Sequence, residues 1–229
     1  MEAIILAGGL GTRLSKVIPD VPKPMAPING KPFLYFLLQW LKQYPVDKLI
    51  LSIGYKSESI MKYFGDSFCS IPVEYVIEEK PLGTGGAVIS ALQKTSDSNI
   101  LILNGDTYFP IDLNKFYLSH VKNNYLFSIA LKRMQNFSRF GSVECRENVV
   151  IKFNEKKFCS DGFINGGIYL VNRQFFELKK LPEVFSLEKE ILEKEAGSSL
   201  LKGIIFDNLF IDIGIPEDYD KAGSFLKTL

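Results

Sequence analysis

A glycine-rich turn near the amino terminus combines two features that phosphate binding requires. Gly8, Gly9 and Gly11 follow an apolar run, and Arg13 comes shortly after them. Glycines let backbone N–H groups approach a ligand closely, and the forked guanidinium of arginine suits phosphate oxygens. The turn has neither the GxxxxGK[ST] spacing of P-loop proteins nor the GxGxxG spacing of dinucleotide-binding proteins, which disfavours both classes.

A second cation, Lys23, lies between Pro22 and Pro24. The two prolines fix the backbone on both sides of the lysine and exclude a regular helix through it. A chain that must hold an ammonium group rigidly beside a phosphate would have this arrangement. Taken alone, however, the segment is better explained as a rigid surface turn with a solvated lysine.

Two aspartates stand at the ends of apolar runs. Asp106 follows residues 100–103, and Asp212 follows Phe210 and Ile211. In an open α/β sheet, a carboxylate that closes a strand lies over the crevice where ligands bind. Two such carboxylates can share one Mg²⁺, a hard ion that prefers carboxylate and phosphate oxygens. An aspartate at a strand end is also often a helix cap or a turn former.

Alternating strands and helices are predicted as the scaffold of these residues. Apolar runs predict strands at residues 3–7, 48–53, 73–77, 99–103, 126–131 and 164–171. Amphipathic stretches predict helices at residues 32–43, 84–94, 113–121, 187–195 and 216–225. The loops at residues 8–14, 80–87 and 104–106 each follow a strand, so we expect the chemistry of the site among them.

The order of these elements predicts the fold class. The first four strands alternate with helices, which is typical of βαβ units. We therefore predict an α/β fold with a Rossmann-like mixed, mainly parallel sheet flanked by helices, in a single domain over residues 1–229. Residues 126–171 are rich in strands. There we expect antiparallel or mixed pairing that carries part of a binding site.

Composition and charge exclude several other kinds of protein. The 229 residues carry 27 Lys and Arg against 26 Asp and Glu, without the basic excess of a general nucleic-acid binder. The single histidine, His120, excludes a histidine-rich metal site, and we expect it to be structural. The three cysteines form no CxxC pair, and we find no signal peptide and no apolar run long enough to span a membrane. We therefore expect a cytoplasmic protein that binds neither nucleic acid nor membrane.

Together, the glycine-rich turn and the Pro22-Lys23-Pro24 segment resemble the signature of sugar-1-phosphate nucleotidyltransferases, the enzymes that make NDP-sugars. Further blocks that resemble the family follow in order at residues 81–87, 104–106, 155–156, 165–169 and 210–216. The resemblance covers essentially the whole chain. It implies a nucleotidyltransferase core and a reaction in which a sugar 1-phosphate attacks the α-phosphorus of a nucleoside triphosphate and releases pyrophosphate.

The resemblance also implies roles for single residues. Arg13 and Lys23 match the family's catalytic cations, which meet the triphosphate and the α-phosphate. Asp106 and Asp212 match the aspartates that hold Mg²⁺, the expected cofactor. The residues implied to bind the nucleotide are Leu6, Ala7, Gly8, Gly9, Gly11, Thr12, Arg13, Lys23, Glu78, Glu79, Pro81, Gly83, Thr84, Gly85 and Asp106.

A second set of residues is implied to bind the sugar phosphate. This set comprises Gly105, Glu155, Lys156, Asn165, Gly166 and Glu188. Lys156 matches a lysine of a Glu-Lys-Pro element that grips the sugar phosphate. In this chain Lys157 replaces the family's proline, so Lys156 and Lys157 both stay candidates for that contact.

Two carboxylates beside the implied base-recognition loop favour guanine. Glu78 and Glu79 precede Pro81, and one carboxylate can accept both the N1–H and the exocyclic amine of guanine. Uracil and thymine present a single N–H between two carbonyls, which a carboxylate would repel. The sequence thus favours GTP, although either glutamate can simply be solvated.

Within the family, the chain is most similar to the members that transfer a guanylyl group to D-glycero-α-D-manno-heptose 1-phosphate. Their product, a GDP-heptose, serves the synthesis of surface polysaccharide such as capsule, S-layer or lipopolysaccharide. Alternatives within the family are mannose-1-phosphate guanylyltransferase, glucose-1-phosphate thymidylyltransferase and N-acetylmuramate-1-phosphate uridylyltransferase. We expect no β-helix domain of the kind that longer members carry. The expected partners are GTP and a sugar 1-phosphate, and a homodimer is a candidate assembly.

Two other classes of protein stay open. A catalytically silent regulatory subunit that binds a nucleotide sugar would be expected to lack a cation or a metal aspartate, and both are present here. A glycosyltransferase with a related sheet would be expected to carry a DxD motif, whereas this chain has Asn104-Gly105-Asp106.

Overall fold

A ten-stranded mixed sheet forms the centre of the computed structural model, which describes residues 1–9, 18 and 21–226. The strand order is β10-β11-β13-β9-β12-β7-β1-β4-β6-β5. Two small sheets accompany it, one pairing β8 with β14 and the other β2 with β3. The strands are β1 Glu2–Leu6, β2 Pro27–Ile28, β3 Lys31–Pro32, β4 Lys48–Ile53, β5 Ser67–Phe68, β6 Ile71–Ile77, β7 Asn99–Asn104, β8 Thr107–Tyr108, β9 Phe127–Phe137, β10 Gly141–Arg146, β11 Val149–Lys156, β12 Cys159–Asn172, β13 Leu201–Phe206 and β14 Ile211–Asp212.

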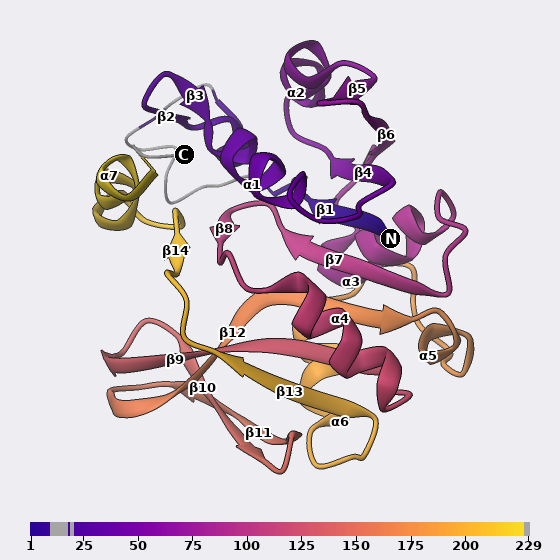
Figure 1. Ribbon diagram of the computed structural model, residues 1–229, viewed down its shortest axis with the longest axis vertical. Coiled ribbons are helices and arrows are strands. Elements are labelled where there is room, and N and C mark those ends of the chain that lie inside the picture. Colours follow the sequence, from indigo (N-terminus) through magenta and orange to yellow (C-terminus); the bar gives the residue numbers. More distant parts are fainter. Residues whose placement is uncertain (10–17, 19–20, 227–229) are drawn as a thin grey trace.

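Helices cover both faces of this sheet, with α1 and α4 in front of it and α3 behind it in Figure 1. Side chains of a strand alternate between the two faces. In β1, Ala3 and Ile5 join the core beneath α1 and α4, while Ile4 joins the core beneath α3. No helix in the described part of the chain is long and apolar enough to cross a membrane. The helices are η2 Lys23–Met25, α1 Phe33–Leu41, α2 Ser57–Phe64, α3 Gly83–Leu92, α4 Leu113–Lys122, α5 Gln174–Glu177, the π-helical η3 Glu188–Leu192, α6 Glu193–Glu195 and α7 Pro216–Phe225.

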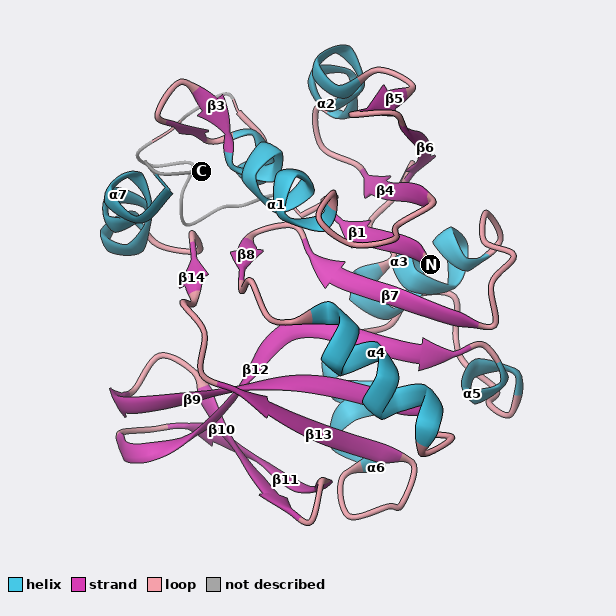
Figure 2. Cartoon of the chain, in the orientation of Figure 1, coloured by secondary structure: helices cyan, strands magenta, loops and turns pink. Residues whose placement is uncertain are grey.

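Strand direction divides the sheet into two parts. Strands β7, β1, β4 and β6 run parallel, as the βαβ pattern predicts. Beyond them, β12 is antiparallel to both β7 and β9, and the arrows of β7 and β12 point in opposite directions in Figure 2. The mixed α/β fold class is confirmed, but the description "mainly parallel" holds only for the first part. In the second part, short turns connect β9, β10, β11 and β12, and such turns join antiparallel strands.

Most predicted elements are confirmed, with shifted ends. The strand predicted at residues 126–131 extends to Phe137 and the one predicted at 164–171 starts at Cys159, because β9 and β12 continue into a long antiparallel pair. The helix predicted at residues 187–195 begins with the π-helical turn η3. Helix α2 and strands β10, β11 and β13 were not predicted.

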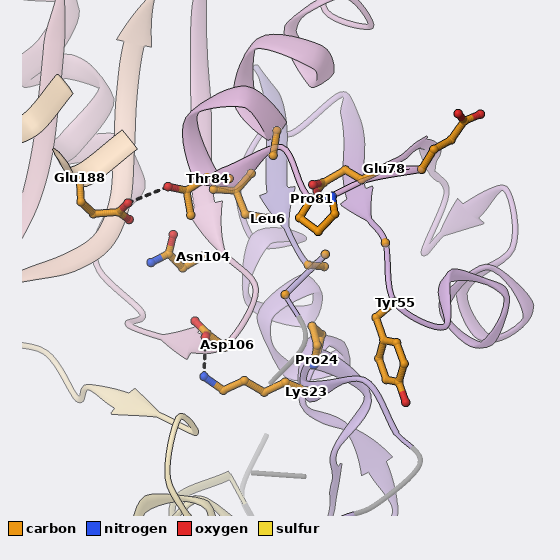
Figure 3. A pocket seen from close by; sticks show the side chains of 17 residues that line it. Leu6, Lys23, Pro24, Tyr55, Glu78, Pro81, Thr84, Asn104, Asp106 and Glu188 are labelled. Carbon is orange, nitrogen blue, oxygen red and sulfur yellow. Dashed lines mark hydrogen bonds and ion pairs between the residues drawn. The ribbon is translucent and has the colours of Figure 1, made fainter. Parts of the chain in front are cut away.

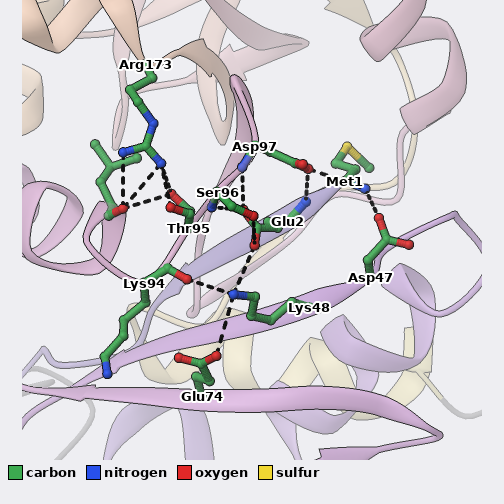
Figure 4. A network of polar contacts seen from close by, with 11 residues as sticks. Met1, Glu2, Asp47, Lys48, Glu74, Lys94, Thr95, Ser96, Asp97 and Arg173 are labelled. Carbon is green, nitrogen blue, oxygen red and sulfur yellow. Dashed lines mark hydrogen bonds and ion pairs between the residues drawn. The ribbon is translucent and has the colours of Figure 1, made fainter.

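A polar network links neighbouring strands at the end of the sheet where β1 begins (Figure 4). Glu2 is only 4% exposed and accepts hydrogen bonds from the backbone N–H groups of Ser96 and Asp97, at 2.6 and 2.8 Å. Lys48 of the neighbouring strand lies 3.0 Å from the other carboxylate oxygen. Burial raises the pKa of Glu2, but these donors outweigh that effect and hold its pKa below the usual value. The network therefore stabilises the amino-terminal ends of these strands, and the candidate site lies at their carboxyl ends.

His120 has the structural role expected of it. Its ring is 1% exposed between α4 and the sheet. Nδ1 lies 2.8 Å from the Ser128 hydroxyl, and Nε2 lies 3.3 Å from Oδ1 of Asn99. Because the Asn99 oxygen only accepts, Nε2 carries the proton and Nδ1 accepts from Ser128. Burial lowers the pKa of His120 to about 4, which keeps the ring neutral.

This burial predicts a loss of stability in acid. Below pH 6.5 the unfolded chain binds a proton at His120 that the folded chain does not, so the free energy of unfolding should fall by about 3 kcal/mol between pH 7 and pH 4. Urea unfolding of the wild type and of His120→Gln, measured across this range, tests the effect. Subtracting the two curves removes the contribution of the carboxylates, and a difference that does not vary with pH would contradict the prediction.

Candidate active site

The carboxyl ends of the parallel strands β1, β4, β6 and β7 surround a pocket of about 840 Å³ (Figure 3). Of the residues predicted to bind substrates, those that line this pocket are Leu6, Ala7, Gly8, Gly9, Lys23, Glu78, Glu79, Pro81, Gly83, Thr84, Asp106 and Glu188. The other residues of the lining are Pro24, Gly54, Tyr55, Ala87 and Asn104, of which Ala87 and Asn104 lie in loops where the chemistry was expected without being named as binding residues. The strand ends therefore gather the predicted residues of three separate loops in one place.

Lys23 joins the two predicted metal aspartates. Its Nζ lies 2.5 Å from Oδ2 of Asp106 and 3.7 Å from Oδ1 of Asp212. The lysine side chain is 12% exposed, so its charge is largely removed from water and faces the carboxylates. Pro24 follows it in the short helix η2, which fixes the backbone from which the lysine reaches into the pocket. The surface-turn explanation with a solvated lysine therefore does not hold, because the lysine is mostly shielded from water and lies beside two carboxylates.

Asp212 is oriented by partners from several segments. Oδ1 accepts a hydrogen bond from the backbone N–H of Gly214 at 2.7 Å, and Oδ2 lies 3.8 Å from Arg139. Arg139 also pairs with Asp218 in the first turn of α7. Burial and the nearby charge of Asp106 raise the pKa of Asp212, while Lys23 and Arg139 act in the opposite direction. The fold thus brings the Asp212 carboxylate close to Asp106. The positive charges of Lys23 and Arg139 offset the unfavourable burial and charge repulsion.

Helix α7 also forms hydrogen bonds with the segment that follows Lys23. The Tyr219 hydroxyl donates to the backbone oxygen of Pro27 at 2.5 Å, and the Asn29 side chain donates to the backbone oxygen of Gly223 at 2.8 Å. Strand β14, which carries Asp212, pairs with β8 just after Asp106. Residues from both ends of the chain thereby fix the geometry around Lys23.

The donor set at Asp106 and Asp212 fits a hard divalent cation that also binds substrate. Both carboxylates lie within 3.7 Å of one ammonium group, so one cation can be shared between them. No group of three or more His, Cys, Asp or Glu side chains in the described ranges could hold a metal ion. Two carboxylates with substrate phosphates and water are the usual ligands of Mg²⁺ in such sites.

Glu78 is built into the wall of the pocket. Its Oε1 accepts from the Ser52 hydroxyl at 3.1 Å, and Oε2 accepts from the backbone N–H of Leu82 at 3.2 Å. A Cβ on Gly8 would lie 2.5 Å from Oε1, so a glycine is needed there. Glu78 therefore connects the ends of β4 and β6 to the loop before α3, while the neighbouring Glu79 is exposed at the pocket rim.

The glycines that begin α3 serve close packing. A Cβ on Gly83, whose φ is +72°, would lie 2.4 Å from the backbone oxygen of Phe185, and one on Gly85 would lie 2.1 Å from the Phe185 ring. Gly85 is buried and donates its N–H to Phe185 O at 3.0 Å instead of lining the pocket. These two glycines therefore admit the segment before Glu188, and because Gly83 also lines the pocket, its role toward the nucleotide stays a prediction.

Other predicted residues lie outside the pocket lining. Gly105 is buried against the end of β1, where its N–H donates to Leu6 O at 2.9 Å. Gly166 is also buried, and a Cβ there would lie 2.6 Å from the Phe109 ring. Glu155 and Lys156 are exposed and lie at the end of β11, not in a loop. Their roles toward the sugar phosphate stay predictions.

Asn165 lies behind the pocket. Its side chain donates to the Tyr169 hydroxyl at 2.8 Å and accepts from the backbone N–H of Gly167. Burial raises the pKa of Tyr169, and the charges of Glu188 and Asp106 raise it further. Gly11, Thr12 and Arg13, all predicted to bind the nucleotide, lie outside the described residues.

The residues that sequence reasoning missed differ in how visible they were. Tyr55 and Gly54 follow the strand predicted at residues 48–53, so the rule that ligands bind at strand ends could have found them. Arg139 carries no such signal. It reaches Asp212 only because the turn after β9 comes close to β14, and that contact depends on tertiary structure.

Comparisons with known proteins agree with this geometry. The family model described as Nucleotidyl transferase matches residues 2–228. The chain is 49% identical to the D-glycero-alpha-D-manno-heptose 1-phosphate guanylyltransferase of Aneurinibacillus thermoaerophilus, over 97% of this chain and 96% of that protein. The protein of the same name from Campylobacter jejuni is 49% identical over 96% of this chain and 97% of its own length. The crystal structure of HddC from Yersinia pseudotuberculosis complexed with GMP-PN has a TM-score of 0.88 and 38% identity, and 99% of each chain is covered.

Proposed function

The chain belongs to the nucleotidyl transferase family, and from this premise we propose that it joins GTP to D-glycero-α-D-manno-heptose 1-phosphate to give GDP-heptose and pyrophosphate. The observation that carries the proposal is the 49% identity to two guanylyltransferases of that specificity over nearly their full length. The pocket supports it, because carboxylates for a base, a partly buried lysine and a pair of aspartates line or adjoin one space.

The proposed reaction needs positioning and charge neutralisation more than proton transfer. An oxygen of the sugar phosphate attacks the α-phosphorus of GTP in line, and pyrophosphate leaves. Lys23 neutralises the reacting phosphates from one side of the pocket, and its rigid backbone fixes where the charge stands. We propose that Asp106 and Asp212 hold the Mg²⁺, which when bound offsets the charge of the phosphate oxygens. No histidine is needed, which suits a chain whose one histidine is buried elsewhere.

A matrix of substrates tests the proposed function. Pyrophosphate release is measured for the purified full chain with each of the four nucleoside triphosphates and a panel of sugar 1-phosphates. We expect the highest kcat/KM for GTP with the heptose 1-phosphate. A different best pair would identify one of the alternative family activities, and no release from any pair by folded protein would refute catalysis and favour a regulatory subunit. The homodimer and the cytoplasmic location stay predictions.

Guanine selection predicts a specific effect at the pocket rim. Glu78→Ala and Glu79→Ala are each measured with GTP and with UTP, and at least one of them should raise KM for GTP about tenfold more than KM for UTP, the cost of losing a hydrogen bond to a charged group. Glu74→Ala, in the preceding strand β6 and outside the pocket lining, is the matched control. Equal effects on both nucleotides in both variants would contradict base recognition by these glutamates.

A further inference from the structure

A hydroxyl at the start of α3 is hydrogen-bonded to a carboxylate from a distant segment of the chain, and both residues line the pocket. Thr84, in the first turn of α3, donates from Oγ1 to Oε2 of Glu188 at 2.6 Å (Figure 3). The same Oγ1 accepts from the backbone N–H of Leu187 at 2.8 Å. The threonine hydroxyl is thus satisfied as both donor and acceptor by the segment that carries Glu188.

The Glu188 carboxylate is held by one oxygen only. Oε2 also accepts from the Ser186 hydroxyl at 2.8 Å. Oε1 has no hydrogen-bond partner among the described residues, and the side chain lines the pocket together with Asn104 and Asp106. A carboxylate fixed at one oxygen presents the other as a strong acceptor in a fixed direction, which suits hydroxyl donors.

The backbone around Glu188 is held just as firmly. Phe185 N–H donates to Leu82 O at 3.0 Å, and Gly85 N–H donates back to Phe185 O at the same distance. Glu188 then begins the π-helical turn η3, a rare geometry that is frequent at functional sites. The start of α3 and the Glu188 segment therefore behave as one unit.

We propose that Thr84 is a positioning residue for the acceptor substrate: its hydroxyl fixes Glu188 so that Oε1 accepts hydrogen bonds from hydroxyl groups of the sugar phosphate. The inference rests on the proposed function, and it changes the role of Thr84. The sequence predicts a nucleotide contact for this residue, whereas its hydroxyl is hydrogen-bonded to the carboxylate that we expect to bind the sugar phosphate.

Thr84→Val tests the proposal, because valine keeps the branched shape and removes the hydroxyl. KM for the sugar 1-phosphate should rise about tenfold, since the charged group loses a hydrogen bond, while KM for GTP changes less than about twofold. Thr84→Ser restores the hydroxyl and should recover most of the affinity for the sugar 1-phosphate. Thr95→Val, beyond the other end of α3, is the control and should change neither KM. The sugar phosphate used is the best substrate of the matrix above.

A double-mutant cycle with Glu188→Gln provides the second measurement. Both variants act through the same carboxylate, so their effects on KM for the sugar 1-phosphate should be clearly less than multiplicative. Ser186→Ala serves if Thr84→Val unfolds, and it should raise the same KM. An equal rise in KM for GTP, multiplicative effects in the cycle, or unchanged kinetics in Thr84→Val would overturn the proposal while the wild-type activity still supports the proposed function. A wild type without turnover would overturn both.

Discussion

Replacing Asp106 with asparagine is expected to lower kcat by about 10²- to 10³-fold, the range found when one preorganised electrostatic group of an active site is removed, because the proposed Mg²⁺ would lose a carboxylate ligand. The change keeps the shape of the side chain and removes the negative charge that faces Lys23 at 2.5 Å. Because Asp106 is 37% exposed, the free energy of unfolding should change little. Pyrophosphate release at saturating GTP and sugar phosphate, with thermal unfolding in parallel, measures both quantities.

Asp220→Asn is the matched control, since this carboxylate is exposed on α7 and outside the pocket lining. It should leave kcat unchanged. A near-normal kcat in Asp106→Asn at saturating Mg²⁺ would show that the reaction does not depend on this carboxylate, and the proposed metal pair would then be wrong.

Replacing Lys23 with methionine is expected to have the second large effect, a fall in kcat of about 10²-fold or more. Methionine keeps most of the length of the side chain but removes the charge that stands between Asp106 and Asp212. The loss should appear mainly in kcat, because we propose that the lysine neutralises charge that develops on the phosphates in the transition state and does not contact the base. Steady-state kinetics with GTP varied, and then with sugar phosphate varied, separate the two constants.

Lys31→Met controls for the loss of an exposed positive charge nearby, because Lys31 packs over the Tyr35 ring and lies outside the pocket lining. The double variant Lys23→Met/Asp106→Asn adds a stringent test. Two groups that form one ion pair should have effects that do not multiply. Fully multiplicative losses would show that Lys23 and Asp106 act independently.

The parallel part of the fold could be predicted from the sequence for a clear physical reason. Strands β1, β4 and β7 are buried on both faces, so they appear as continuous apolar runs that need no tertiary information. The rule that ligands bind beyond the carboxyl ends of such strands then placed Gly8, Pro81 and Asp106 in one region, and the structure brings them together.

The antiparallel part was harder to predict because its patterns are weaker. Strand β11 has exposed positions on both faces, β10 has one buried residue, and the pairing of the two strands is interrupted by register shifts. The location of Glu155 and Lys156 depends on that register, so a sequence motif could identify these residues but not place them relative to Lys23. The glycines of α3 show a similar limit. The sequence signals that a side chain is excluded, and only the packing of Phe185 shows what excludes it.

The contact between α7 and the Lys23 segment has a consequence for how the protein is made. A chain emerging from the ribosome folds its amino-terminal elements first, so β1, β4 and β7 can form a sheet with Lys23 and Asp106 nearby. Asp212 and the helix whose Tyr219 hydrogen-bonds to Pro27 are translated after all of these elements. The proposed pair of aspartates is therefore completed only after β13 has been made, and a nascent chain that already contains Lys23 and Asp106 still lacks the second carboxylate.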